Sequence, residues 1–142
     1  MLKHKSEKIE LLEKLPLFDG LTRKQVEQVG RLADLIAVPA GRRLATAGEY
    51  GGELIVIVEG DVSVTTGRRR PLRLGPGEFF GEMSLVDGQP RSATVVAESD
   101  LLVLVVGQRA FSSLVEASPL LALRIMQVLT RRLRETESLV SA

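Results

Sequence analysis

The stretch FFGEMSLVDGQPRSATV, from Phe79 to Val95, decides how this chain is interpreted. A glycine and Glu82 begin a predicted short helical turn, and Asp87-Gly88 marks a tight turn after it. Pro90 then holds the preceding residue extended, which leaves the following arginine little freedom as the chain enters a strand. The stretch therefore predicts a helical turn, a tight turn and a strand in close succession.

The residue types of this stretch suit a phosphate joined to a ribose. Free backbone amides at the helix start and the guanidinium fork of Arg91 make a compact site for one phosphate. Glu82 would repel an isolated anion, but a carboxylate accepts hydrogen bonds from sugar hydroxyls. Neither common triphosphate motif is present, because Gly81 comes one position too late to complete G-x-G-x-x-G with Gly75 and Gly77, and no P-loop lysine follows.

The composition excludes most familiar catalytic chemistry. With 142 residues, 44% of them hydrophobic, the chain is predicted to be one globular domain with its own core. It has no cysteine, and its single histidine is His4 in a polar N-terminal tail. Thiolate and histidine metal sites, a cysteine nucleophile and a Ser/His triad are therefore excluded. We expect a protein that is not an enzyme and that has no metal or other cofactor.

Charge and hydropathy indicate the cellular context. The formal net charge of +1 gives no basic footprint for nucleic acid, so no direct DNA binding is expected. No apolar run approaches the roughly 20 residues of a membrane span, and the N-terminus has no apolar signal-peptide core. These features predict a cytoplasmic protein.

The order of periodic segments predicts an α+β, mainly β, fold. A helical N-terminal segment covers residues 6–31, with Thr22 as the N-cap of its second helix. Residues 32–107 contain short β-rich runs separated by Gly, Pro and Asp, namely LIAV, LIVIV, DVSVTT, LRL, SATVVA and LLVLVV, with a bulge or bend at Gly60. C-terminal helices follow over residues 108–137, the last one opened by Ser118 and Pro119. We predict an antiparallel, jelly-roll-like β-roll flanked by N-terminal helices and a C-terminal lid helix.

FGEMSL followed by PRSATV closely resembles the phosphate-binding cassette of cyclic nucleotide-binding domains. Such domains occur in bacterial catabolite activators, cyclic-AMP-dependent kinase regulatory subunits and cyclic-nucleotide-gated channels. The segments PLFDGLT, VPAGRRLATAGE, VIVEGDVSV and LGPGEFFGE follow the family's order, so the resemblance covers about Leu15 to Leu133.

The resemblance implies a role for each cassette residue. Glu82 would accept a hydrogen bond from the ribose 2′-hydroxyl, and Arg91 would pair with the phosphate oxygens. Backbone amides would come from Gly81, Ser92 and Ala93, and the Ser92 hydroxyl would add a contact. The remaining predicted ligand contacts are Met83 and the apolar walls Val64, Leu74 and Phe79. For the lid over the base, the last helix offers Thr130, Arg131 and Arg134.

Simpler structural roles remain open for these residues. Glu82 could complement the helix dipole and Arg91 could form a surface ion pair. Val64, Leu74 and Phe79 could be ordinary core residues. The basic run Arg68 to Arg70 suits a solvated hairpin tip, with membrane or nucleic-acid contact as the alternative, and the arginines of the last helix suit a solvated face.

The resemblance implies a regulatory function without catalysis. We expect a sensor for cyclic AMP, with cyclic GMP as the alternative ligand, that switches its C-terminal helix when ligand binds. Its partner would be an unidentified protein effector or a second copy of the chain. The chain ends without a helix-turn-helix domain, so we expect either a stand-alone sensor or a regulatory fragment of a larger channel, transporter, enzyme or transcription regulator. A degenerate domain that no longer binds ligand is a third possibility, which the intact Glu82 and Arg91 oppose.

Overall fold

The N-terminal helices form a small layer at one end of the molecule. The computed structural model describes residues 5–67 and 70–141, with side-chain burial described from residue 7 to residue 135. Helix α1 (Lys5–Glu13) leads through a 3-10 helix, η1 (Pro16–Phe18), into α2 (Arg23–Leu32). The predicted N-cap is confirmed: Thr22 accepts a hydrogen bond from the Gln25 amide, and the Gln25 side chain accepts one from the Thr22 amide.

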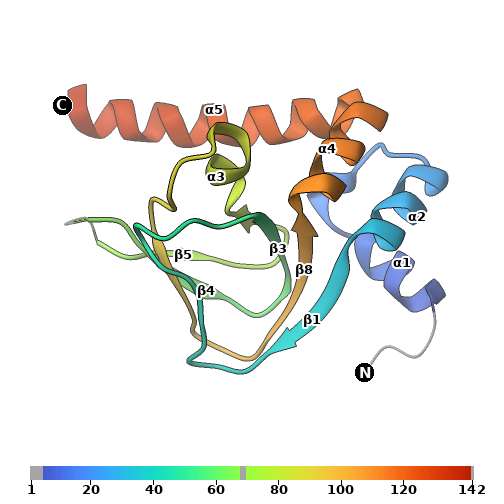
Figure 1. The fold of residues 1–142 in the computed structure, drawn as a ribbon, viewed down its shortest axis with the longest axis horizontal. Coiled ribbons are helices and arrows are strands. Elements are labelled where there is room, and N and C mark those ends of the chain that lie inside the picture. The colour runs from blue at the N-terminus through green and yellow to red at the C-terminus, as the bar shows by residue number, and fades with distance from the viewer. Residues whose placement is uncertain (1–4, 68–69, 142) are drawn as a thin grey trace.

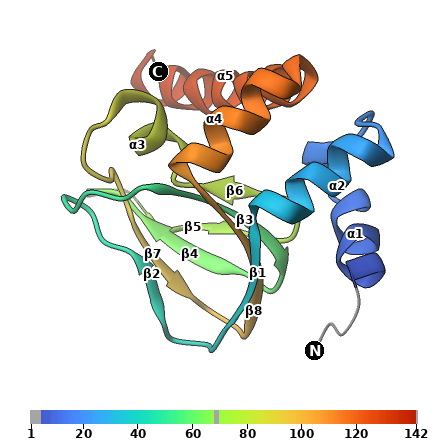
Figure 2. The ribbon, with the colours of Figure 1, turned by 45° about the vertical axis from the view of Figure 1, so that its right-hand side comes forward.

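In the described residues, eight antiparallel strands in two four-stranded sheets make up the roll, which confirms the predicted fold class. One sheet has the order β1-β8-β3-β6 and the other the order β2-β7-β4-β5. Figure 2 shows both sheets, with the N-terminal helices beside the first. The strands are β1 (Asp34–Val38), β2 (Arg43–Ala45), β3 (Glu53–Glu59), β4 (Val62–Thr65), β5 (Leu72–Leu74), β6 (Phe79–Phe80), β7 (Thr94–Ala97) and β8 (Leu101–Gly107).

Strands β3 and β8 are buried on both faces, which explains their unbroken apolar runs. In β3, Leu54 and Val56 pack under the helices, whereas Ile55 and Ile57 face the interior between the sheets. β8 pairs with β1 and β3, and its side chains also point alternately into the core under the helices and the core between the sheets. A strand covered on both faces has no polar side to present to solvent, so its sequence does not alternate. The predicted bend is present, since the β3–β8 register shifts before Glu59 and Gly60 has a φ of 89°.

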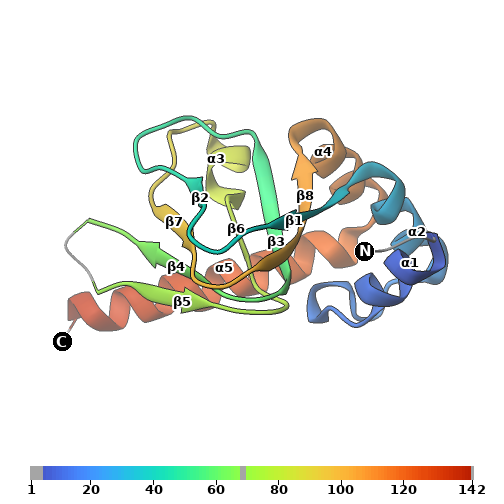
Figure 3. The same cartoon turned by 90° about the horizontal axis from the view of Figure 1, so that it is seen from below.

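The C-terminal helices close the fold. α4 (Gln108–Ala117) is followed by the long α5 (Pro119–Ser141), and the predicted N-cap, Ser118, accepts a hydrogen bond from the Leu121 amide at 3.3 Å. In Figure 1, α5 runs above the roll, on the same side as α3 (Glu82–Asp87), and in Figure 3, seen from below, it passes behind the strands of the roll. Leu121 and Ile125 anchor α5 in the core under the first sheet.

Some elements differ from the sequence-based expectation. The strands β2 and β6 were not predicted, and α5 extends to Ser141 rather than to residue 137. Both strands are only two or three residues long, so their pairing with β7 and β3 defines them more than their own sequence. Of the predicted basic hairpin tip, Arg68 and Arg69 lie outside the described residues, and Arg70 is exposed.

Candidate functional site: the cassette between β6 and β7

Gly81 makes the sharp turn that starts the cassette. It follows β6, whose Phe79 and Phe80 pair with Val56 and Ile55 of β3, and it has a φ of 93°. A Cβ atom at this position would collide with the Glu53 carbonyl oxygen. Because only glycine combines this backbone angle with so close an approach, the sequence places a glycine before Glu82. The predicted short helix, α3, follows at once.

The far end of α3 is closed by the predicted tight turn. Gly88, with a φ of 70°, donates its amide to the Ser84 carbonyl oxygen at 3.0 Å. The Gln89 amide then donates to Asp87 Oδ1 at 2.9 Å. The two turns fix the ends of α3 and bring the chain back toward β7.

The loop between β2 and β3 fixes the backbone of Arg91. The Arg91 amide donates to the Glu49 carbonyl oxygen at 2.7 Å, and its own carbonyl accepts from the Gly48 amide at 2.9 Å. The side chain then runs along Gly51 toward Gly81, where Arg91 Nη1 would lie 2.8 Å from an added Cβ atom. Among the side chains that the structure describes, in residues 7–67 and 70–135, no carboxylate lies within 4.0 Å of this guanidinium. The surface ion pair considered for Arg91 is therefore absent from the described part of the chain, and the cation faces the cassette turn.

Glu82 is buried and paired with an arginine of α5. The residue is 3% exposed, and its Oε1 accepts a hydrogen bond from Arg132 Nη1 at 2.8 Å. Arg132 Nη2 donates to the Phe79 carbonyl oxygen at 2.6 Å, and the guanidinium carbon lies 4.8 Å from the centre of the Phe79 ring. α5 is thus connected directly to the first residue of α3 and to β6.

The remaining polar cassette residues lie between α3 and β7. Ser92 is exposed, and its hydroxyl donates to the sulfur of Met83 at 3.9 Å. Met83 is 53% exposed, whereas Ala93 is half-buried. The Thr94 hydroxyl accepts from the Ala47 amide at 3.0 Å, a second connection between β7 and the loop that holds Arg91.

The three predicted apolar walls lie in the two cores. Phe79 is 2% exposed and belongs to the core under the helices. Val64 on β4 and Leu74 on β5 are partly buried against the core between the sheets. Core packing thus accounts for much of their burial, and their contact with a ligand stays a prediction.

In the described part of the chain, no hydrogen bond or ion pair joins the three predicted lid residues to the cassette. Thr130 donates its hydroxyl to the Met126 carbonyl oxygen of its own helix, and Arg131 and Arg134 are exposed. Sequence reasoning missed Arg132, the α5 residue that reaches Glu82. Its helical spacing could have identified it, because Arg132 continues the stripe of core-facing residues formed by Leu121, Ile125 and Val128.

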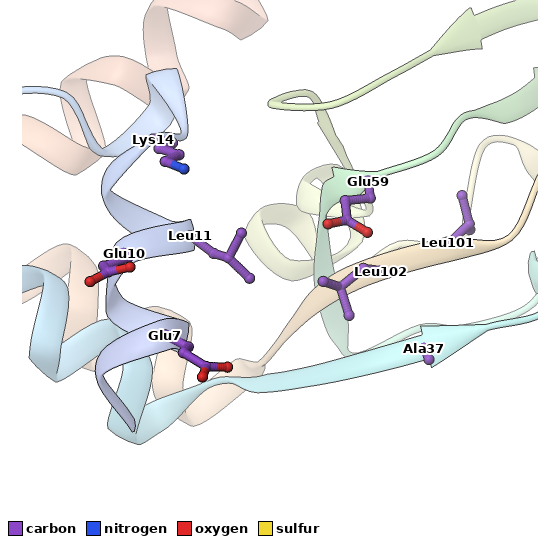
Figure 4. A pocket seen from close by; sticks show the side chains of 8 residues that line it. All are labelled: Glu7, Glu10, Leu11, Lys14, Ala37, Glu59, Leu101 and Leu102. Atoms are coloured by element: carbon purple, nitrogen blue, oxygen red, sulfur yellow. The ribbon is translucent and has the colours of Figure 1, made fainter. Parts of the chain in front are cut away.

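A separate groove lies far from this cassette in the fold. It has a volume of about 460 Å³ and lies between α1 and one end of the first sheet. Figure 4 shows Leu11 of α1 pointing across it toward Leu102 and Glu59. Its other lining residues are Glu7, Glu10, Lys14, Ala37 and Leu101. Three carboxylates against one ammonium make this groove unsuitable for an anionic nucleotide.

Among the described residues, no group of three or more His, Asp or Glu side chains could hold a metal ion. No single described helix is long and apolar enough to cross a membrane. Only α4 and the first part of α5 taken together reach that length and composition, and they are bent by 112° at their junction.

The sequence matches the cyclic nucleotide-binding domain family over residues 35–118. This range contains the β-roll from the second residue of β1 to the end of β8, including the cassette with Gly81, Glu82 and Arg91. The chain therefore belongs to the cyclic nucleotide-binding domain family, as the resemblance predicted.

Similar proteins fall into several functional classes. A cyclic nucleotide-gated potassium channel of Mesorhizobium japonicum is 40% identical over 113 residues, which cover 80% of this chain and 31% of the channel. The cyclic AMP receptor protein of Thermus thermophilus is 35% identical over 127 residues, covering 86% of this chain and 59% of the receptor. The chain thus spans about a third to three fifths of the length of these relatives.

Solved structures agree with this assignment. The Thermus thermophilus catabolite activator protein superimposes with a TM-score of 0.81 at 34% identity, covering 89% of this chain and 62% of that one. A cyclic nucleotide-binding domain from Methylobacillus flagellatus gives a TM-score of 0.75 at 29% identity, covering 94% and 80% of the two chains. The chain is a cyclic nucleotide-binding regulatory domain by family and by fold.

Proposed function

We propose that this domain is a sensor that prefers cyclic AMP and that transmits binding through α5. One observation carries the proposal. The guanidinium of Arg91 and the buried carboxylate of Glu82 lie beside the same glycine turn, and Arg91 has no carboxylate partner in the described part of the chain. This combination suits a ligand that has an anionic phosphate beside hydroxyl donors. The relative named as a cyclic AMP receptor protein supports the choice of ligand.

The contact between α5 and the cassette supports the transmission step. Glu82 belongs to the group that would hold the ribose, and it is paired with Arg132 of α5 at 2.8 Å. A ligand that changes the hydrogen bonding of Glu82 therefore changes the free energy of one α5 position relative to another. The described residues contain no group of three or more His, Asp or Glu side chains that could hold a metal ion, and the role that we propose is regulation rather than turnover.

Calorimetric titration tests the ligand assignment. We expect cyclic AMP to bind with micromolar or tighter affinity and linear 5′-AMP to bind far more weakly, because a dianionic phosphate would lie close to the Glu82 carboxylate. The two nucleotides have the same base and the same ribose, so the comparison isolates the cyclic phosphate. Equal affinities would overturn the proposed cassette function.

We also propose that α5 carries the surface through which the domain meets a second copy of itself. Leu123, Met126 and Leu133 are 46%, 54% and 59% exposed, and their spacing places them on one face of the helix. An apolar stripe with this three-and-seven spacing can pack against the same stripe of a second helix. The stripe lies away from Arg132, so both contacts can form on one helix.

Sedimentation equilibrium tests this interface. We expect the unaltered chain to dimerise and Met126→Glu to be monomeric. Gln108→Glu adds a carboxylate at an exposed position of α4 and should leave the dimer intact. A monomeric unaltered chain would exclude the second copy and leave another protein as the partner of the stripe.

A further inference from the structure

Met83 and Met126 expose their side chains to solvent and therefore to small oxidants. The sequence contains no cysteine and no tryptophan, so the thioethers of its methionines are the side chains that a peroxide oxidises most readily. Met83 of α3 is 53% exposed and Met126 of α5 is 54% exposed. Neither residue belongs to a buried core, so an oxygen atom added to either sulfur does not have to disturb core packing.

Met83 differs from Met126 in the partner of its sulfur. In the described structure, the Ser92 hydroxyl donates a hydrogen bond to Met83 Sδ at 3.9 Å. Ser92 directly follows Arg91, and we propose both residues for the phosphate. A thioether sulfur is only a weak acceptor, so this bond leaves the hydroxyl available to a ligand. The cassette therefore holds an exposed, oxidisable sulfur beside one of its proposed ligand donors.

We propose that Met83 is a modification site at which oxidation by a peroxide weakens nucleotide binding. This inference rests on the proposed function, because it assumes that the Ser92 hydroxyl serves the phosphate. In the reaction, the sulfur lone pair attacks one oxygen of hydrogen peroxide, an S–O bond forms and the O–O bond breaks. Sulfur is oxidised and the peroxide is reduced. The second oxygen leaves as hydroxide and takes the remaining proton, so the products are methionine sulfoxide and water.

The new oxygen changes the preferred partner of the Ser92 hydroxyl. A sulfoxide is polar, and its oxygen is a much stronger hydrogen-bond acceptor than the thioether sulfur. This oxygen is attached to the atom toward which the hydroxyl already donates. A serine hydroxyl has a single proton to donate, so it cannot serve the sulfoxide and the phosphate at the same time. Loss of one such hydrogen bond corresponds to a roughly two- to tenfold loss of affinity.

The test compares the cyclic AMP affinity of each protein before and after treatment with hydrogen peroxide, with mass spectrometry reporting the sulfoxide at each methionine. We expect the unaltered chain to bind roughly two- to tenfold more weakly after oxidation. Met126→Leu should show the same loss, and Met83→Leu should show none. Each variant is its own reference, so any effect of the substitution itself cancels. An equal loss in Met83→Leu, or an unchanged affinity of the unaltered chain once Met83 is oxidised, would overturn the proposal.

Ser92→Ala identifies the group through which the sulfoxide acts. Without the hydroxyl, oxidation of Met83 should change the cyclic AMP affinity by less than about twofold. A loss in Ser92→Ala as large as that in the unaltered chain would overturn competition for the hydroxyl proton. Methionine sulfoxide reductases for both sulfoxide epimers should restore the affinity of the oxidised, unaltered chain. A loss that persists after Met83 is reduced again would trace the effect to other damage and contradict the proposal.

The rate of oxidation provides a readout that needs no variant. Met83 and Met126 have nearly the same exposed fraction, so Met126 is an internal reference within the same chain. Saturating cyclic AMP should slow sulfoxide formation at Met83 relative to Met126, because a ligand held at Ser92 covers the neighbouring sulfur. An unchanged ratio of the two rates would place the ligand away from Met83 and overturn the proposal. Failure of the unoxidised chain to bind cyclic AMP would instead refute the proposed function, and this inference with it.

Discussion

The guanidinium of Arg91 packs against the α-carbon of Gly51 so closely that a Cβ atom at residue 51 would overlap Arg91 Nε and Cζ. These residues are 40 positions apart in the sequence. The contact arises because the loop between β2 and β3 holds the Arg91 backbone on both sides. The position of the cation that we propose for the phosphate is thus set by a segment outside the cassette itself.

Gly51→Ala should weaken cyclic AMP binding by roughly tenfold, the cost of misplacing about one charge-assisted hydrogen bond. The new methyl group would push the Arg91 side chain out of its path, whereas the backbone at residue 51 has no positive φ that alanine would strain. The unfolding midpoint should therefore stay within roughly 2 °C of the parent value. Calorimetric titration and thermal unfolding measure the two effects separately.

The adjacent Gly52→Ala is the matched control for this prediction. A Cβ atom at Gly52 has no neighbour within 4 Å, so binding should be unchanged. Loss of affinity in Gly52→Ala equal to that in Gly51→Ala would point to loop rigidity rather than to displacement of Arg91.

Arg91→Ala should weaken cyclic AMP binding by roughly one to two decades, because charge-assisted bonds of about 1.5–3 kcal/mol to the phosphate are lost. The fold should survive, since within the described residues Arg91 has no carboxylate partner to leave unpaired. Arg91→Lys should be intermediate, because an ammonium cannot form the bidentate fork. Binding by Arg91→Ala as tight as that of the parent would place the phosphate elsewhere.

Ser92→Thr should raise the affinity for cyclic GMP relative to cyclic AMP by roughly two- to tenfold, which corresponds to one hydrogen bond of about 0.5–1.5 kcal/mol. The resemblance to the family associates a threonine after the cassette arginine with recognition of guanine. In the described structure the one hydrogen bond of the Ser92 hydroxyl is a weak one to the sulfur of Met83, so the hydroxyl is available to a ligand. Competition titrations with both nucleotides measure the ratio.

Two results would contradict the assignment of base preference. A clear preference of the unaltered chain for cyclic GMP would reject cyclic AMP as the ligand. An unchanged ratio in Ser92→Thr would show that base selection lies outside this position.

Lys8→Met should lower the free energy of unfolding by about 0.5–2 kcal/mol, because the Lys8 ammonium completes the C-terminal end of α2. Lys8 Nζ donates to the carbonyl oxygens of Gly30 at 2.6 Å and Ala33 at 2.8 Å. Urea unfolding measures the change. Lys24→Met, at an exposed position without a hydrogen bond or ion pair to the described residues, should be nearly neutral. An equal loss of unfolding free energy in Lys24→Met would show that removing a positive charge, and not losing the Lys8 hydrogen bonds, causes the effect.

The sequence by itself determined the elements whose signals are local. The runs LIVIV and LLVLVV correspond to β3 and β8, and the polar residues Thr22 and Ser118 mark the starts of α2 and α5. The same holds for the positions where Gly81 and Gly88 begin and end α3. Periodicity, caps and positive-φ glycines depend on neighbours within a few residues, so they can be recognised without the fold.

Only the tertiary structure decided which side chains meet across long separations. The Arg132–Glu82 pair joins residues 50 positions apart, and periodicity alone shows Arg132 on the buried face of α5 without showing its partner. The short strands β2 and β6 have the same origin, because two or three residues become a strand only when β7 or β3 lies alongside. The physical reason is that such contacts form only when loop closure and the packing of layers bring distant parts of the backbone together. A local sequence pattern depends on neighbours within a few residues, so it does not show which distant segments will meet.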